Sequence, residues 1–187
     1  MSSLDARAQR AGTAPLSRLS AVMCVVVSGG ALAALIALAW VWLSPRAVVT
    51  LLAPRLGLAW VPIALDGWTR AAGFLVSMIP MGVLLYLLHQ AYQLFDAYRR
   101  GLVFTDTAPL RLRRIGLCMV ALGVLRPVTA TALGVLLTLA NPSGQHILAI
   151  GVSIDDYMIA ACGGLVLAIG HVLVEAKRIA DENGQII

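Results

Sequence analysis

The chain has 187 residues, of which 60% are hydrophobic and 12% are charged, and its formal net charge is +5 at pH 7. So few charged residues cannot cover the surface of a soluble domain of this size, and the mean hydropathy of +0.89 indicates a membrane protein. The basic residues lie at the ends of apolar runs, a pattern that indicates membrane orientation. We therefore expect contact with membrane lipids and no direct nucleic-acid binding.

Four apolar runs follow one another along the chain, at about residues 19–43, 71–92, 115–140 and 157–176. Each is near or above the roughly 20 residues that a helix needs to cross the hydrocarbon core. In lipid the backbone must satisfy its own hydrogen bonds, so these runs predict helices. The sequence therefore predicts an all-α, polytopic membrane protein. A tail at 1–18 precedes a membrane domain at 19–187, in which four transmembrane helices form a bundle.

Prolines modify this simple plan. Pro80 and Pro127 fall inside the second and third runs, where each removes a backbone donor and should kink its helix. The connection at 44–70 holds three more prolines, which argues against one continuous helix there. Because this connection is still apolar, we expect a short amphipathic element in the membrane interface, with a re-entrant loop as the alternative.

Basic residues are distributed unevenly between the two sides of the predicted membrane. By the positive-inside rule, both termini, a hairpin at 93–114 and a tail at 177–187 are cytoplasmic in a bacterial inner membrane. Tryptophans that flank the connection at 44–70 fit the opposite interface. The basic residues of the cytoplasmic side are Arg7, Arg10, Arg18, Arg99, Arg100, Arg111, Arg113, Arg114, Lys177 and Arg178; those of the other side are Arg46, Arg55 and Arg70.

The hairpin at 93–114 carries turn and capping signals as well as charge. Gly101 is suited to end the second helix in a left-handed conformation. Asp106 or Thr107 can cap the third helix, with Pro109 in its first turn, where a missing amide costs little. We also expect the arginines of this hairpin to pair with the acidic residues of the carboxy-terminal tail, because both emerge on one side.

This hairpin and its spacing to the flanking runs resemble a bacterial family of small four-span membrane proteins, catalogued as domain of unknown function 2975. The resemblance extends from about residue 19 to the end and rests on a block like YRRGxxFT…LRRIG and on the closing tail. The final GQII departs from the acidic residue and threonine before a final valine that many members have. The matching residues are Tyr98, Arg99, Arg100, Gly101, Phe104, Thr105, Leu112, Arg113, Arg114, Ile115 and Gly116 in the block, and Ala176, Glu182 and Asn183 in the tail.

The resemblance implies no assigned activity. Genes of the family often lie beside one for a small helix-turn-helix regulator, which implies a cytoplasmic transcription regulator as a partner. On this basis the candidate partner-binding residues are Tyr98, Arg99, Arg100, Gly101, Phe104, Thr105, Arg111, Arg113, Arg114, Glu182 and Asn183.

Arg126 lies near the middle of the third run, beside Pro127. A guanidinium at the bilayer centre costs something like 3 kcal/mol on insertion scales and usually faces a partner inside the protein. No acidic residue lies in the middle of another run, so we expect its partners to be freed carbonyls or hydroxyls. It is either a structural residue that reaches toward an interface or a contact for an anion or ligand.

Small residues cluster at 28–39 and 159–170, and the spacing from Ala160 to Gly164 suits close helix packing. This favours packing within the chain, although the same spacing would also serve a dimer face and so a homo-oligomer. Asp155 and Asp156 are expected to cap the fourth helix.

Chemistry-bearing motifs are sparse. His89 and His171, near the ends of the second and fourth runs, could hold one haem or a metal only if they faced each other. No nucleophile–base set, phosphate loop or paired carboxylate accompanies them, and the three cysteines lack metal-ligand spacing. We therefore expect no cofactor and no enzyme.

The leading hypothesis is a regulatory or interaction protein whose cytoplasmic hairpin and tail engage a soluble partner. The alternatives are a small transporter or channel subunit that uses Arg126 and, with less support, a haem-binding electron carrier.

Overall fold

The computed structural model describes residues 3–58, 61, 63, 65–100, 107–139 and 152–184; the side chains of 3–17, 180, 183 and 184 lie outside this description. Every regular element in these residues is a helix, which confirms the predicted all-α class. The elements are α1 (Ser3–Leu43), α2 (Pro45–Ala47), a π-helical turn η1 (Val48–Leu52), α3 (Ala53–Arg55), α4 (Gly67–Arg99), α5 (Ala108–Thr138) and α6 (Ile154–Gly184).

Four of these helices are long and apolar enough to cross a membrane, within Arg18–Leu43, Gly67–Arg99, Ala108–Thr138 and Ile154–Ile179. The chain is thus built as a multi-pass membrane protein. The helices extend past the apolar runs that predicted them: α1 begins at Ser3, within the expected tail, and α6 continues to Gly184. Hydropathy detects only the lipid-compatible part of a helix, and the polar turns beyond it hydrogen-bond equally well.

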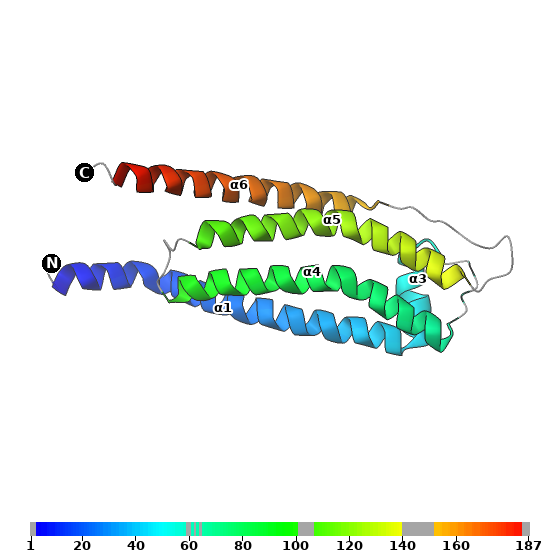
Figure 1. The fold of residues 1–187 in the computed structure, drawn as a ribbon. Helices are drawn as coiled ribbons and strands as arrows, with labels where there is room; N and C mark the ends of the chain where they lie inside the picture. The colour runs from blue at the N-terminus through cyan, green and yellow to red at the C-terminus, as the bar shows by residue number, and fades with distance from the viewer. Residues whose placement is uncertain are drawn as a thin grey trace.

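The long helices form a row in chain order (Figure 1), in which α4 packs on α1, α5 on α4 and α6 on α5. Among the described residues, the backbone of α1 does not approach that of α5 or α6, and the backbone of α4 does not approach that of α6. This arrangement is an open row, so the closed four-helix bundle expected from the sequence gains no support from these contacts. The start of α1 and the end of α6 lie at the same end of the row.

Glycines bring α5 and α6 into backbone contact. A Cβ added to Gly123 would lie 2.6 Å from the Ala160 Cβ, and one added to Gly163 would lie 2.6 Å from the Met119 Cβ. Gly116 and Gly170 also face backbone atoms of the partner helix. Small residues therefore permit the closest interface in the row, as expected where lipid supplies no hydrophobic drive for association.

One part of the small-residue prediction is wrong. Gly164, expected to form the contact surface with Ala160, has nothing within 4 Å of an added Cβ, whereas its neighbour Gly163 packs on α5. The contact surface of α6 therefore follows a different face from the one that the four-residue spacing indicated.

The segment between α1 and α4 packs against the protein on one face. Its buried residues Val48, Ala53 and Leu58 join Leu133 and Leu137 of α5 in a hydrophobic cluster. The helical turns here end at Arg55, so no single helix runs through 44–70, although Pro45 and Pro54 both lie within these turns. A wider π turn directly before Pro54 relieves the crowding and lost donor that a proline causes.

The segment ends in a tight reversal at Gly57. Its φ of 73° lies in the left-handed region that suits glycine. The Leu58 N–H donates to the Ala53 carbonyl at 2.8 Å, and the Gly57 N–H donates to the Pro54 carbonyl at 3.2 Å. These two bonds form a Schellman motif, and the buried Leu58 supplies its usual hydrophobic contact.

The start of α4 is fastened to the end of α1 by polar groups. The Arg70 guanidinium donates to the Trp42 carbonyl through Nε at 3.0 Å and Nη2 at 2.8 Å, and to the Leu43 carbonyl through Nη2 at 2.6 Å. The Trp42 indole packs against Gly73, which has no Cβ to obstruct it, and donates to the Ser77 hydroxyl at 3.1 Å. Arg70 thus satisfies carbonyls that the end of α1 would otherwise leave without donors.

Candidate functional site

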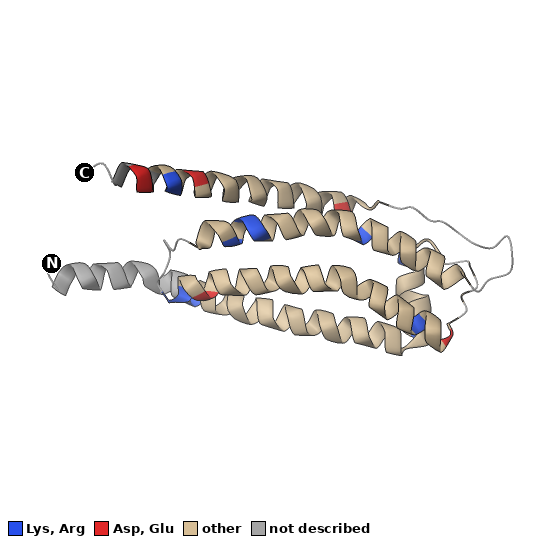
Figure 2. Cartoon of the chain, viewed as in Figure 1, with Lys and Arg blue, Asp and Glu red and all other residues tan. Residues whose placement is uncertain are grey.

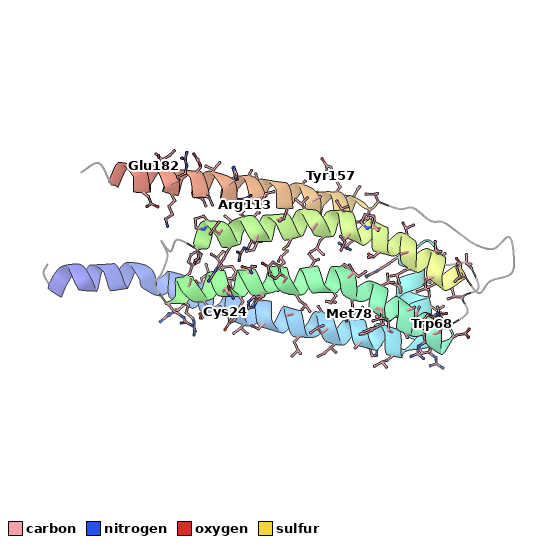
Figure 3. All side chains as sticks on the ribbon, viewed as in Figure 1. Cys24, Trp68, Met78, Arg113, Tyr157 and Glu182 are labelled. Carbon is pink, nitrogen blue, oxygen red and sulfur yellow. The ribbon has the colours of Figure 1, made fainter. Side chains whose placement is uncertain are left out.

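Charged side chains gather at one end of the row, which we call the polar end and define as residues 93–100, 107–114 and 171–184. Figure 2 shows this concentration on the last turns of α4, the first turns of α5 and the second half of α6. The opposite end, called the α3 end, comprises residues 43–58, 65–70 and 133–139 and carries few charges. Figure 3 places Arg113 and Glu182 toward the polar end and Trp68 at the α3 end.

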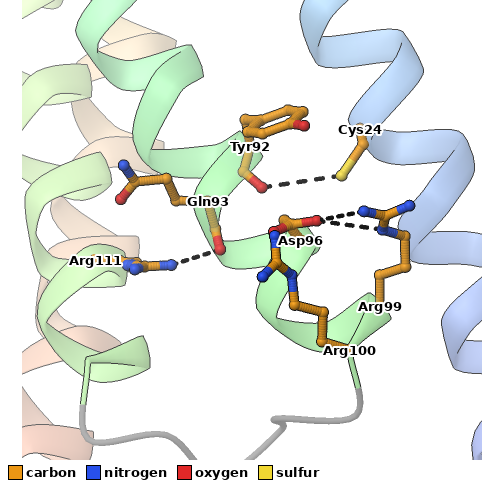
Figure 4. A network of polar contacts seen from close by, with 7 residues as sticks. All are labelled: Cys24, Tyr92, Gln93, Asp96, Arg99, Arg100 and Arg111. Atoms are coloured by element: carbon orange, nitrogen blue, oxygen red, sulfur yellow. Dashed lines mark hydrogen bonds and ion pairs between the residues drawn. The ribbon is translucent and has the colours of Figure 1, made fainter.

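Asp96 is the centre of a small ion-pair network at the end of α4 (Figure 4). Its Oδ1 accepts from Arg99 Nη2 at 2.8 Å and from Nε at 3.2 Å, while its Oδ2 lies 2.6 Å from Arg100 Nη2. The Asp96 side chain is only 16% exposed, whereas those of Arg99 and Arg100 are more than half exposed. One carboxylate therefore organises two arginines of the family-like block and offsets part of their charge.

The sequence analysis did not identify Asp96. Its signal was present, because an acidic residue three and four positions before two arginines places all three on one helix face. The block was instead considered as a set of basic residues, so the acid that precedes it was overlooked.

Arg111 ties α5 to α4. Its Nη1 donates to the Gln93 backbone carbonyl (Figure 4), eighteen residues back along the chain in a neighbouring helix. The thiol of Cys24 on α1 lies 3.9 Å from the Tyr92 carbonyl, so α1 also contacts this part of α4. The Gln93 side chain bonds to the His89 ring at 2.7 Å. Arg111 thus stabilises the interface between helices.

Arg113 and Arg114 differ from their neighbours in that no described residue pairs with their charge. Both are exposed, and neither forms a hydrogen bond or ion pair with another residue of the described part of the chain. The backbone of Arg113 packs against Gly170 of α6, which places this arginine beside the helix that forms the carboxy-terminal tail. These two guanidinium groups form a basic surface at the polar end.

The acidic residues Glu175 and Glu182 pair within α6 itself. Arg178 Nη2 approaches the Glu175 carboxylate, and Arg178 Nη1 lies 3.0 Å from Glu182 Oε1. The expectation that such acids pair with the arginines of the hairpin is therefore wrong for these two residues. Glu175 and Glu182 lie three and four residues from Arg178 on the same helix, so Arg178 is closer to them than the arginines of the hairpin are.

The other candidate residues are only partly described. Tyr98 is half-buried on α4. Gly101, Phe104 and Thr105, together with the side chain of Asn183, lie outside the described residues, so the expected C-cap at Gly101 does too.

Arg126 has the acidic partner that the sequence analysis did not find. Its Nε lies 3.4 Å from Asp156 Oδ1, and the side chains of Arg126 and Asp156 are 47% and 9% exposed. Asp156 was expected only as a cap at the membrane surface. The glycine contacts between α5 and α6 instead set the first turn of α6 beside Gly123 and Arg126.

Asp156 also caps its helix, as predicted. The cap uses Oδ2, whereas Oδ1 faces Arg126. Oδ2 accepts from the Ser153 N–H at 3.2 Å and the Ser153 hydroxyl at 3.0 Å, and the Asp156 N–H donates back to that hydroxyl at 3.2 Å. This is a capping box in which Ser153 is the N-cap. Oδ1 is buried and makes no hydrogen bond within the described residues, so Arg126 supplies charge compensation at a distance too long for a normal hydrogen bond.

His89 and His171 are not brought together. They lie on α4 and α6, which do not pack against each other, and both are exposed. Among the described residues, no group of three or more His, Cys, Asp or Glu is placed to hold a metal ion.

The comparison with protein families gives one match, which covers three of the four long helices. Residues 58–187 match the family described as protein of unknown function, DUF2975. The chain belongs to this family. The match confirms the resemblance seen in the sequence over residues 58–187, which include α4, α5, α6 and the whole polar end of these helices, but it does not extend to residues 19–57. No curated protein and no solved structure matches the chain.

Membership in DUF2975 carries no activity with it, so a functional interpretation of this member rests on its own residues. Asp96, Arg113, Arg114, Arg126 and Asp156 all fall inside the matched segment. Residues 1–57, including all of α1 and the α2–η1–α3 segment, precede it.

Proposed function

We propose that this DUF2975 protein is a non-catalytic regulatory protein of a bacterial inner membrane, with both termini and the α4–α5 connection in the cytoplasm. The observation that carries the proposal is the uncommitted basic surface of Arg113 and Arg114, beside a charged extension of α6. Basic residues that hold a loop in the cytoplasm need no particular arrangement. Two exposed guanidinium groups on adjacent residues, one of them on a backbone that packs against α6, suit an acidic patch on a soluble partner.

The partner that fits best is a small helix-turn-helix transcription regulator that presents acidic side chains to the membrane. The gene neighbourhood typical of the family supports this choice, and the paired charges along α6 add a second exposed surface. Asp96 would hold Arg99 and Arg100 in place at the edge of the contact, since its carboxylate already binds both.

The test places a photo-crosslinking amino acid at position 110 in cells and identifies the crosslinked partner by mass spectrometry. Leu110 is exposed and lies one turn before the two arginines. Replacing Arg113 and Arg114 together by Gln should reduce the crosslinked regulator about fivefold or more, because two interfacial charges worth about 0.5 kcal/mol each are removed.

The matched control replaces Arg46 and Arg55 by Gln at the α3 end, which removes the same charge from two exposed positions. It should leave crosslinking unchanged. An equal loss in both double variants, or no loss in the first, would refute the proposal.

The transporter alternative has less support than this proposal. Its central residue, Arg126, is already neutralised by Asp156, so its charge is not available to attract an anion without breaking that pair. The haem alternative requires two histidines that the row of helices keeps on non-adjacent members.

A further inference from the structure

A pocket of about 390 Å³ opens between the end of α1 and the start of α4, at the α3 end. Its walls are almost wholly apolar and include Ala39, Leu43, Ala71 and Phe74. The charged residue among its lining is Arg70. The volume falls within the roughly 300–1,000 Å³ typical of small-molecule sites, so the pocket can enclose part of a ligand.

The pocket lies at the ends of two candidate membrane spans. It is formed by the last turns of one candidate span and the first turns of the next. Trp40 and Trp68 flank it and are 56% and 78% exposed, and Trp68 stands at this end of the molecule in Figure 3. Since exposed tryptophans favour the level of the headgroups, the pocket opens at the depth where phosphates adjoin acyl chains.

Arg70 presents a free edge at this pocket. Its Nε and Nη2 are fixed by the carbonyls at the end of α1, while Nη1 forms no hydrogen bond with any described residue. No carboxylate of the described chain lies within ion-pair distance, and Asp66, one turn earlier, contributes only its backbone carbonyl to the Arg70 N–H. The pocket therefore combines an apolar cavity with one immobilised, uncompensated positive charge.

We propose that this pocket binds one anionic phospholipid. An acyl chain would lie against Ala39, Leu43 and Phe74, and the phosphate would meet the free edge of the Arg70 guanidinium. Guanidinium groups suit phosphate oxygens because their donors are planar and fixed. The carbonyl bonds hold the side chain in place, so little of its conformational freedom remains to be lost on binding. A lipid is the occupant that fits, since the lining is apolar and the opening lies at headgroup depth.

The experiment measures quenching of Trp42, which lines the pocket, by brominated lipids. The full-length protein, with Trp40, Trp60 and Trp68 replaced by Phe, is reconstituted at equal mole fractions of dibromo-phosphatidylglycerol or dibromo-phosphatidylcholine. The effective affinity derived from quenching should favour phosphatidylglycerol about fivefold, the factor that one basic residue contributes at a membrane surface.

Two variants test the two halves of the site. Arg70→Gln should abolish the preference for the anionic lipid. Because Arg70 also satisfies the end of α1, Ala39→Leu provides a second variant that fills the pocket and leaves every Arg70 bond in place; it should reduce quenching by both lipids. Ala37→Leu is the matched control, since Ala37 is exposed on the same helix and does not line the pocket.

Equal quenching by the two lipids in the parent protein would overturn the proposal. The proposal would also be overturned if brominated lipids quenched Trp42 as strongly in the Ala39→Leu variant as in the Ala37→Leu variant. This inference does not depend on the proposed regulatory function, because the pocket and the polar end lie at opposite ends of the row.

Discussion

At the scale of single residues, several charges of the long helices are held in ion pairs, whereas two arginines in the first turns of α5 are not. Asp96 and Arg178 each hold two partners, and Arg126 is matched by Asp156. Arg113 and Arg114 have no such partner among the described residues. An unpaired charge is inexpensive in water and costly in lipid. The contrast therefore marks the first turns of α5 as a surface that remains in water.

The Arg126–Asp156 pair should show energetic coupling. Arg126→Met leaves a buried carboxylate without compensation, and Asp156→Asn leaves a guanidinium within a span, so each single change should destabilise the fold. The double variant removes both charges and should recover part of the loss, which gives a coupling energy of about 0.5–3 kcal/mol. Unfolding of the four proteins by sodium dodecyl sulfate, followed by circular dichroism, measures it.

Asp155→Asn is the control for this cycle, because Asp155 is exposed and adjacent and forms no ion pair within the described residues. It should show no coupling to Arg126→Met. Additive effects of Arg126→Met and Asp156→Asn would mean that the two groups do not interact across α5 and α6.

At the scale of helices, the sequence predicts what each element is more reliably than where it lies against its neighbours. The apolar runs at 71–92 and 115–140 predicted α4 and α5, because lipid exposure leaves a direct compositional signal. The register of α6 on α5 has no such signal. It depends on which glycines meet, and the choice of Gly163 over Gly164 places Asp156 beside Arg126. The ion pair could not be predicted without that register.

The glycine contact gives a test at this scale. Gly163→Ala should destabilise the α5–α6 interface by about 1–3 kcal/mol, because the new methyl group would meet the Val120 backbone nitrogen at 2.7 Å. Gly164→Ala, one residue away in open space, should leave the protein as stable or slightly more so, since alanine favours the helix. Thermal unfolding in detergent compares them, and equal melting temperatures would contradict this packing.

At the scale of the whole molecule, the four spans return the chain to the end at which it began. Figure 1 shows the start of α1 and the end of α6 together at that end. The excess of basic residues there predicts that this end is cytoplasmic. The open row leaves α1 and α6 as its two outer members, each with one long-helix neighbour in the described structure.

Reporter fusions test this orientation. Green fluorescent protein fused to the carboxy terminus should fluoresce, and alkaline phosphatase fused there should be inactive. Phosphatase inserted after Gly57, in the reversal that follows α3, should instead be active because that position faces the opposite side. A carboxy-terminal fluorescent fusion that stays dark, together with an active phosphatase fusion at the same position, would show the opposite orientation. The proposed regulatory surface would then not face the cytoplasm.

The order of packing along the row has a consequence for biogenesis. Each long helix rests on the one synthesised before it, so α4 can associate with α1, and α5 with α4, while later residues are still in the ribosome. Arg126 enters the bilayer with α5, before α6 brings Asp156 to it. Its charge must then be tolerated transiently, by water or by reaching toward headgroups, until the last helix arrives. Membrane insertion of α5 should consequently be the slow, most easily interrupted stage of assembly, and the arrival of α6 completes it.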